Sequence, residues 1–527
     1  MSRVLDKKLC TANEAVALIK DGQTIASGGF VGAAHPEALT SALEQRFLKT
    51  AKPRDLTLVY AAGQGDGKDR GANHLAHQGL LKRVVGGHWG LAPKLGKLAI
   101  DGLIEAYNFP QGVVSQLFRD IAAGRPGCIT HIGLNTFIDP IVMGGRLDER
   151  TPAGLVERVE LGGRTWLWYK SFPIDVGLIR ATAADPVGNL VMYREVMFGE
   201  VLPIAQAAHN SGGIVIAQVE RLQEELANPQ VVKVPGILVD KIVVAEAHEH
   251  EQTFSEAFNP GYCSARPKDE AVGANLKPLP MGPRRIIAAR ACDEVPENAI
   301  ANLGIGMPEG IARIAAERGH LDNFTLTVES GPFGGMPAGG LSFGASLHPY
   351  AVVDQPSQFD FYDGRGLDFA SLGLAQADAY GNVNVSKFGS KLAGVGGFVN
   401  ITQTAKRLVF SGTFTASGLE IEVGDRKLRI LNEGMIRKFV VQVEQISFSA
   451  KRSREIGQDV LYVTERAVFR LVKDGIELIE VAPGIDVEEQ ILALMDFKPI
   501  IRNPRPMPAY LFEPAFCNPS ENTNAPK

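Results

Sequence analysis

Two distant stretches of this 527-residue chain share one order of apolar and β-branched residues that ends in glycine. Residues 56–63 (LTLVYAAG) align without a gap with residues 324–331 (FTLTVESG). Upstream of them, Ile25-Ala-Ser-Gly-Gly-Phe matches Ile300-Ala-Asn-Leu-Gly-Ile-Gly306, and a proline then opens a helix in each copy. This self-similarity predicts an internal duplication.

A second pair of similar segments, later in each half, extends the repeat. Residues 178–189 resemble residues 372–382, and both read as strands that end in an Asp-x-x-Gly-Asn turn. The strand-turn-helix-strand order predicts a parallel α/β layer, and the chain is longer than one hydrophobic core usually serves. We therefore expect two related open α/β domains, residues 1–258 and 284–527, joined by a linker at 259–283 that is rich in proline and glycine.

Glu329 is where the two copies differ most in chemistry. Residues 325–328 have the composition of a buried strand, and Gly331 and Pro332 cannot continue one, so Glu329 should lie at the strand's carboxyl end. Open α/β sheets bind their ligands at that end. The alignment sets Glu329 opposite Ala61. The alternative, an ordinary charged residue at a strand exit, remains open from this stretch alone.

Two glycine-containing segments offer hydrogen-bond donors to a developing negative charge. In the longer first half, Pro110-Gln-Gly112 precedes a helical stripe that Gly124 ends, which places Gln111 at a helix N-terminus. In the second half, Gly394-Val-Gly-Gly-Phe398 allows close approach of a ligand to backbone N–H groups. A capping turn and a plain loop are the respective alternatives.

Composition excludes several classes of function. A net charge of −5 gives no reason to expect nucleic acid or an anionic membrane as partner. The five cysteines are scattered, which predicts neither a disulfide framework nor a zinc site. No stretch approaches the roughly 18 apolar residues of a membrane helix, so a cytosolic protein is expected.

Standard catalytic motifs are also missing. The chain has no G-x-x-x-x-G-K-[ST], no H-E-x-x-H and no G-x-S-x-G. The segment from Asn302 to Gly310 follows a strand and opens a helix, but it departs from the G-x-G-x-x-G of NAD-binding proteins. A carboxylate at a strand end, surrounded by glycines, remains, and a carboxylate can act as a nucleophile.

The chain resembles family I coenzyme A transferases, most closely the single-chain acetate/propionate type, over nearly its whole length. The order and spacing of several motifs carry the resemblance: Gly28-Gly-Phe with Pro36-Glu37, Gly86-Gly-His-Trp, Pro110-Gln-Gly112, Asn302-Leu-Gly-Ile-Gly306, Val328-Glu-Ser-Gly331, Phe359-Asp-Phe-Tyr362, Val385-Ser-Lys-Phe-Gly389 and Gly394-Val-Gly-Gly-Phe398. It implies the CoA-transferase/isomerase-like fold, with the two domains corresponding to separate subunits of other members.

The resemblance also implies roles for single residues. Glu329 would be the nucleophile that becomes a glutamyl-CoA thioester, with Ser330 replacing the Asn or Ala that many members carry next to it. Gln111 would bind the reacting carboxyl group or its oxyanion. Further CoA or oxyanion contacts would come from Gly396, Gly397, Asn302, Gly304 and Gly306. The resemblance does not decide which glycine of the 394–397 loop donates.

The implied reaction is exchange of CoA between a short-chain acyl-CoA and a carboxylate such as acetate or propionate. It proceeds by ping-pong chemistry through a mixed anhydride and needs no metal or cofactor, because one thioester is exchanged for another. The resemblance further implies a homo-oligomer, a dimer or tetramer. Two alternatives remain: an acyl-CoA hydrolase that uses the same carboxylate, and a non-catalytic sensor of acyl-CoA or a related metabolite.

Overall fold

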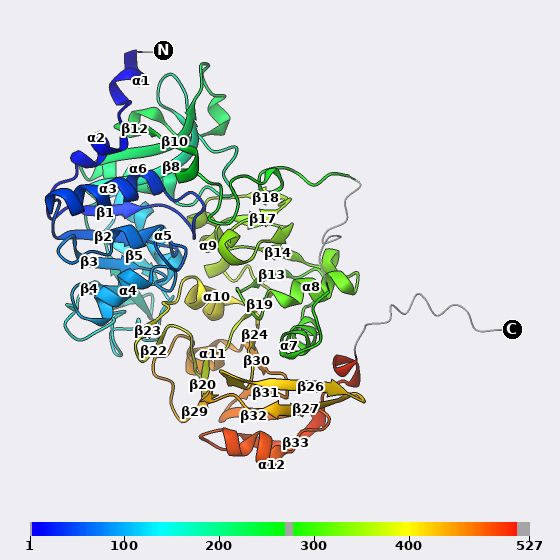
Figure 1. Cartoon of the computed structure of the whole chain (residues 1–527). Coiled ribbons are helices and arrows are strands. Elements are labelled where there is room, and N and C mark those ends of the chain that lie inside the picture. Colours follow the sequence, from blue (N-terminus) through cyan, green and yellow to red (C-terminus); the bar gives the residue numbers. More distant parts are fainter. Residues whose placement is uncertain (1–2, 269–277, 514–527) are drawn as a thin grey trace. The chain divides into compact units, whose positions relative to one another are not determined.

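The computed structural model describes residues 3–268 and 278–513, and within them the chain forms two units (Figure 1). The first unit holds the chain up to Arg266 together with two segments from later in the sequence, Val328–Gly364 and Ser386–Gln403. The second unit holds the other described residues. Glu329, Gln111, Gly396 and Gly397 therefore all belong to the first unit.

The first unit is built on a sheet whose central strands are all parallel, in the order β4-β3-β2-β1-β8-β10-β12. These strands are β1 (Thr24–Ser27), β2 (Leu56–Tyr60), β3 (Leu81–Gly86), β4 (Glu105–Asn108), β8 (Val176–Ala184), β10 (Ile214–Leu222) and β12 (Lys241–Val244). The short β9 (Leu190–Val191) and β11 (Val232–Val234) add antiparallel pairings. Every residue of β8 is buried, as expected for a central strand covered on both faces.

Helices of the first unit begin where the sequence offers start signals. Thr11 and Glu14 form a complete capping box at α2 (Ala12–Ala17). The other helices are α1 (Arg3–Lys8), α3 (Glu37–Thr50), α4 (Pro93–Ile100), α5 (Gln111–Ala122), α6 (Val201–Asn210), α9 (Gln355–Asp363) and α10 (Phe398–Thr404). A separate antiparallel sheet contains β5 (Gly127–Thr130), β7 (Arg164–Lys170) and β6 (Val156–Leu161).

The second unit repeats the parallel core and then extends it. Its sheet runs β14-β13-β19-β24-β30, with all neighbours parallel. These strands are β13 (Ile300–Leu303), β14 (Thr325–Thr327), β19 (Phe369–Gly373), β24 (Arg407–Ser411) and β30 (Asp459–Val463). β31 (Ala467–Val472) and β32 (Gly475–Val481) follow as an antiparallel meander, and β33 (Ile500–Pro506) pairs parallel to β32. Its helices include α7 (Pro283–Cys292), α8 (Gly310–Glu317) and α11 (Ala450–Ile456).

Strand pairing shows the duplication directly and corrects one match by a single residue. Thr24 pairs with Thr57 in the first unit, and Ile300 pairs with Thr325 in the second. The counterpart of Ile300 is therefore Thr24, whereas the sequence match had placed Ile300 on Ile25. Similar apolar letters recur at adjacent positions of a buried strand, so letters alone do not set the register.

A carboxylate at the equivalent place in each unit supports that register. The Thr24 N–H donates to Asp175 Oδ2 at 2.7 Å, and the Ile300 N–H donates to Asp368 Oδ2 at 3.0 Å. With Thr57 thus equivalent to Thr325, the gapless alignment from these residues onward keeps Ala61 opposite Glu329. The predicted contrast between the two copies holds in three dimensions.

The two Asp-x-x-Gly-Asn turns are also the same structure. Asp185 Oδ1 accepts from the N–H of Asn189 at 2.9 Å, and Asp185 Oδ2 accepts from the Asn189 side chain at 2.9 Å. Asp378 makes the same two contacts with Asn382 at 2.9 and 3.0 Å. Both aspartates are fully buried. The predicted fold, two related open α/β domains, is confirmed in its architecture.

Part of the expected organisation falls outside the described residues. The predicted linker 259–283 includes residues 269–277, which are not described, and the assignment of 1–258 and 284–527 as duplicated halves stays a prediction about the sequence. In the described part of the chain, no helix combines the length and the apolar character needed to span a membrane.

Candidate active site

Glu329 lies in a tight turn directly after β14, as predicted, although the strand ends at Thr327, one residue earlier than expected. The Gly331 N–H donates to the Val328 carbonyl at 3.0 Å, and the Val328 N–H donates to the Pro332 carbonyl at 3.0 Å. These two bonds fix Glu329 as the first of the two residues at the tip of the turn. Its side chain is largely buried, with the residue 8% exposed.

Ser330 anchors the same turn. Its hydroxyl donates to the Gly344 carbonyl at 2.5 Å, and the residue is fully buried. The Gly331 carbonyl accepts from the Val353 N–H at 3.1 Å, so the far side of the turn is also tied to neighbouring chain. The turn is therefore rigid around the carboxylate.

The glycine loop before α10 is held by hydrogen bonds to two segments of the first half. Trp89 N–H and Gly90 N–H both donate to the Ala393 carbonyl at 2.8 Å. The Val395 N–H donates to Asn108 Oδ1 at 3.0 Å. Asn108 is fully buried, and its amide also donates to the Gly86 carbonyl at 2.9 Å. Hydrogen bonds therefore hold this loop in a fixed position in the first unit.

Gly396 and Gly397 differ in what their N–H groups do. The Gly396 N–H donates to the Gly87 carbonyl at 2.7 Å, and the Gly396 carbonyl accepts from the Gln111 N–H at 2.9 Å. Within residues 3–268 and 278–513, the Gly397 N–H donates no hydrogen bond. A side-chain carbon added at Gly397 would lie 3.6 Å from Cγ of Glu329, so this backbone closely approaches the carboxylate side chain. Of the two glycines, Gly397 has the available donor.

Gln111 is the first residue of α5, as predicted, and only 2% of it is exposed. Its side-chain Nε2 is buried and has no hydrogen-bond partner among the described residues. Its Oε1 lies 3.5 Å from the position that a side-chain carbon on Gly396 would take. A buried amide donor without a partner costs free energy in the ligand-free protein, which favours binding of an anionic oxygen at this point.

His88 lies beside these donors and had been noted in the sequence only as part of a motif. Its ring packs against Gly396, 3.7 Å from Cδ2 to the ideal side-chain carbon of that glycine. Burial lowers the pKa of His88 to about 4, so the imidazole is neutral near pH 7. Its buried Nδ1 has no partner in the described part of the chain. The segment Gly86-Gly-His-Trp89 is the sequence feature that could have identified His88 as a site residue.

The other predicted contact residues belong to the second unit. Asn302 is the third residue of β13 and its amide donates to the Thr327 carbonyl at 3.3 Å. The Gly304 N–H donates to the Ser371 carbonyl at 2.9 Å. Gly306 has a φ of +86°. A role for these three residues in CoA binding stays a prediction.

Comparison with known proteins decides the family. The family model described as coenzyme A transferase matches residues 10–245. The acetate CoA-transferase YdiF of Escherichia coli (strain K12) is 42% identical over 497 residues, which cover 93% of this chain and 92% of that protein. The chain belongs to the coenzyme A transferase family.

Two further matches extend over the same length. The caffeate CoA-transferase of Acetobacterium woodii is 42% identical to this CoA-transferase, covering 94% of this chain and 95% of that protein. A crystal structure of YdiF from Escherichia coli O157:H7, described as a thioester complex with CoA, superposes with a TM-score of 0.90 at 41% identity and covers 96% of each chain. The predicted family and the predicted enzyme class, a CoA-transferase, are confirmed.

Proposed function

We propose that this CoA-transferase moves CoA from a short-chain acyl-CoA to a carboxylate such as acetate or propionate, with Glu329 as the covalent nucleophile. The observation that carries the proposal is the convergence of three groups in one unit: the Glu329 carboxylate, the Gly397 N–H and the unpartnered Gln111 amide. The similarity to an acetate CoA-transferase over 93% of the chain supports acetate as acceptor.

The chemistry follows from these groups. The Glu329 carboxylate attacks the thioester carbonyl of an acyl-CoA, and the collapse of the tetrahedral species releases CoA thiolate and leaves an acyl-glutamyl anhydride. The thiolate then attacks the glutamyl carbonyl, which gives the enzyme-CoA thioester and frees the first carboxylate. A second carboxylate reverses both steps, so no atoms or electrons are gained or lost.

Each tetrahedral species carries an oxyanion, which needs hydrogen-bond donors. The Gly397 N–H and the Gln111 Nε2 are proposed for this role, and a single such donor contributes about 3–4 kcal/mol to the transition state. The Gly396 N–H is already used in the bond to Gly87. The proposed part of Gly396 is to hold Gln111, because the Gly396 carbonyl accepts from the Gln111 N–H.

Other expectations remain part of the proposal. The reaction uses no metal or cofactor, with CoA and acyl-CoA as substrates, and Asn302, Gly304 and Gly306 are expected to contact CoA. A cytosolic location and a homo-oligomer, dimer or tetramer, remain predictions. Neither nucleic acid nor a membrane is an expected partner.

The direct test is to trap the enzyme thioester. The protein is incubated with acetyl-CoA without an acceptor, treated with borohydride, digested and analysed by mass spectrometry. We expect reduction at Glu329, and no reduced peptide in Glu329→Ala. An unmodified wild-type protein, or a Glu329→Ala variant that retains transferase activity, would refute the proposal.

The hydrolase alternative uses the same groups and requires a separate measurement. Free CoA and acetyl-CoA are both measured in one reaction of propionyl-CoA while the acetate concentration is varied. A transferase forms acetyl-CoA without net release of free CoA, because the enzyme thioester reacts with acetate in preference to water. Release of free CoA at the full rate at every acetate concentration would identify a hydrolase instead, and acyl-CoA binding with neither product would identify a sensor.

A further inference from the structure

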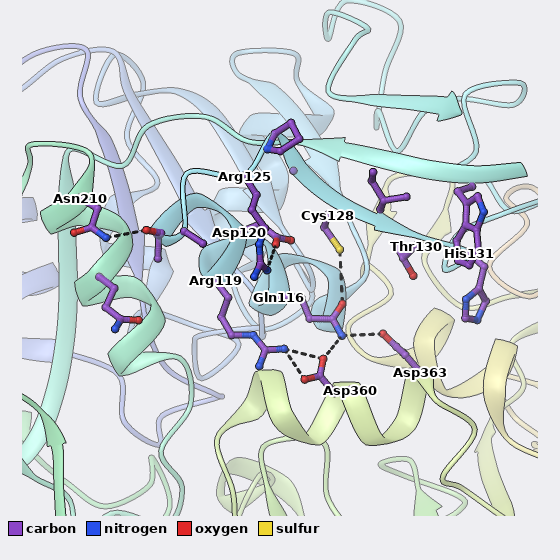
Figure 2. A pocket seen from close by; sticks show the side chains of 17 residues that line it. Gln116, Arg119, Asp120, Arg125, Cys128, Thr130, His131, Asn210, Asp360 and Asp363 are labelled. Carbon is purple, nitrogen blue, oxygen red and sulfur yellow. Dashed lines mark hydrogen bonds and ion pairs between the residues drawn. The ribbon is translucent and has the colours of Figure 1, made fainter. Parts of the chain in front are cut away.

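A cavity of about 1000 Å³ lies on the first unit beside the C-terminal half of α5 (Figure 2). Gln116, Arg119 and Asp120 of α5 line it, as do Asp360 and Asp363 of α9. The arginines in Figure 2 are already paired: Arg119 Nη2 binds Asp360 Oδ2 at 2.6 Å, and Arg125 Nη1 binds Asp120 Oδ1 at 3.0 Å. The cavity therefore does not offer an unpaired guanidinium for an anionic ligand.

Asp363 is the carboxylate of this cavity that makes no ion pair with either arginine. Its Oδ1 accepts from Asn400 Nδ2 at 2.9 Å, and its Oδ2 accepts from Asn400 Nδ2 at 3.2 Å and from Gln116 Nε2 at 3.2 Å. Figure 2 shows the Gln116 contact. Asp363 thus binds two side-chain amides, one on α5 and one on α10.

Asn400 carries the link onward to the active site. It is fully buried, and its Oδ1 accepts from the N–H of Gly112 at 3.2 Å. Gly112 is the second residue of α5, next to Gln111. The N–H groups of the first helical turn have no partner within a helix, so Asn400 satisfies one of them from outside.

The carboxylate decides which way the Asn400 amide points. An asparagine side chain can present either its oxygen or its nitrogen, but both Asp363 oxygens accept from the Asn400 nitrogen. Burial raises the pKa of Asp363 to about 7, and in its ionised form, which only accepts hydrogen bonds, it requires the Asn400 nitrogen to face it and leaves the oxygen facing the Gly112 N–H. Without that constraint, the Asn400 amide can rotate and turn its nitrogen toward the Gly112 N–H. Both groups are donors, so the hydrogen bond to Gly112 would be lost.

We propose that Asp363 is a positioning residue for CoA transfer: through Asn400 it holds the first turn of α5, and with it Gln111, against the glycine loop 393–397. The inference rests on the proposed function, because it concerns the placement of the Gln111 donor. Asp363 itself does not touch the reacting atoms. The start of α5 is bonded to the chain before and after Gly397. The Gln111 N–H donates to Gly396, and the Gly112 N–H donates to Asn400.

The test compares Asp363→Ala with Asp360→Ala, a matched change on the same helix that removes the ion pair to Arg119 and the 3.0 Å bond from Gln116 Nε2 but leaves the bonds between Asp363 and Asn400. We expect Asp363→Ala to lower kcat by about 10- to 100-fold with KM for acyl-CoA nearly unchanged, because misplacement of a donor by a fraction of an ångström acts on the transition state. Asp360→Ala should keep wild-type kcat. Asp363→Asn, which preserves size and one acceptor oxygen, should recover part of the loss.

A double mutant distinguishes positioning from general structural support. If Asp363 acts through Asn400, then Asp363→Ala combined with Asn400→Ala should lower kcat no further than Asn400→Ala alone. Additive losses in kcat, or wild-type kcat in both Asp363 variants, would overturn the inference. Thermal unfolding of each variant confirms that it is folded, and Asp363→Asn provides the test if Asp363→Ala does not fold.

The two proposals fail in different ways. Failure of the proposed function appears as wild-type protein that forms no thioester on Glu329. Failure of the positioning role appears as normal trapping on Glu329 in wild type together with wild-type kcat in Asp363→Ala and Asp363→Asn.

Discussion

The turn after β2 and the turn after β14 began as copies of one structure and now perform different work. The first reads Ala61-Ala62-Gly63 and is buried in the first unit, with both alanines 1% exposed. The second carries Glu329 at the equivalent of Ala61 and is the candidate covalent centre. The Asp-x-x-Gly-Asn turns, by contrast, have kept the same hydrogen bonds in both copies.

This difference shows where a duplicated fold tolerates specialisation. The strand ends can exchange an apolar residue for a reactive one because the sheet beneath holds either turn in place. The first half then contributes what its own turn lacks, the Gln111 amide at the start of α5 and the segment 87–90 that holds the glycine loop. In the proposed mechanism, one copy supplies the nucleophile and the other supplies a donor for the charge that forms.

The largest effect is expected where the two turns differ. Glu329→Ala makes the second turn resemble the first, and we expect transferase activity to fall by about 10⁴-fold or more, as for loss of a covalent nucleophile. Steady-state transfer from acetyl-CoA measures it. Ala61→Glu is the converse control and should neither create a second thioester nor restore Glu329→Ala. Activity from the double variant Ala61→Glu, Glu329→Ala would break the comparison.

The second-largest effect on activity is expected at Gln111, the proposed side-chain donor from the first half. Gln111→Ala removes the unpartnered Nε2, and we expect kcat to fall by about 10²- to 10³-fold, the usual cost of one oxyanion donor. Gln206→Ala, on α6 of the same unit, is the control and should keep wild-type kcat. A change in KM alone would show that Gln111 contributes to substrate binding but not to the transition state.

Backbone differences between the turns predict unequal tolerance of alanine. In Gly331→Ala the new carbon would lie 2.1 Å from the Val353 carbonyl oxygen at a φ of +131°, so backbone must move. In Gly63→Ala the nearest atom is Nδ1 of His88 at 2.6 Å, and a side chain moves more easily. Chemical denaturation should show a loss of about 3 kcal/mol for Gly331→Ala and about 1 kcal/mol for Gly63→Ala. Equal losses would mean that both turns are equally constrained.

The conserved turns should respond alike. Asp185→Ala and Asp378→Ala each remove a buried acceptor and leave the donors of their turns without it, so each should lower the free energy of unfolding by about 2 kcal/mol. Denaturant melts of the two variants provide the measurement. A clear inequality would show that one copy of this turn has been relieved of its structural role.

The smallest effect on activity is expected at a buried carboxyl group that has no part in the proposed mechanism. Burial raises the pKa of Glu200 to about 8, although Gln355 donates to it. Its folded pKa lies above the unfolded value, so its contribution to stability is present below about pH 4.5 and is lost as pH rises to about 8. Glu200→Gln should therefore gain stability over wild type across this window, with kcat unchanged. A stability difference that does not vary with pH would contradict the assignment.

Local patterns predicted several helix starts and turns well, including two in the site. The capping residue Thr11, the start of α5 at Gln111 and the turn at Glu329 were all readable, because each depends on a few adjacent residues. The one-residue error at Ile25 came from strand register, which neighbouring strands decide. The proline-containing segment after Asn503 continues β33 through Pro506 and pairs with β32. A proline-rich segment can pair at a sheet edge when the neighbouring strand supplies the partner groups.

The sequence by itself determined that the chain is a duplicated α/β protein with one carboxylate at one of two equivalent strand ends. Only the tertiary structure decided that Val328–Gly364 and Ser386–Gln403 belong to the first unit, beside Gln111. The bonds that achieve this, from Gly396 to Gly87 and from Gly112 to Asn400, join residues about 300 positions apart. Three of the four groups in these bonds belong to the backbone and the fourth is the Asn400 side-chain oxygen, so side-chain patterns along the sequence do not reveal them.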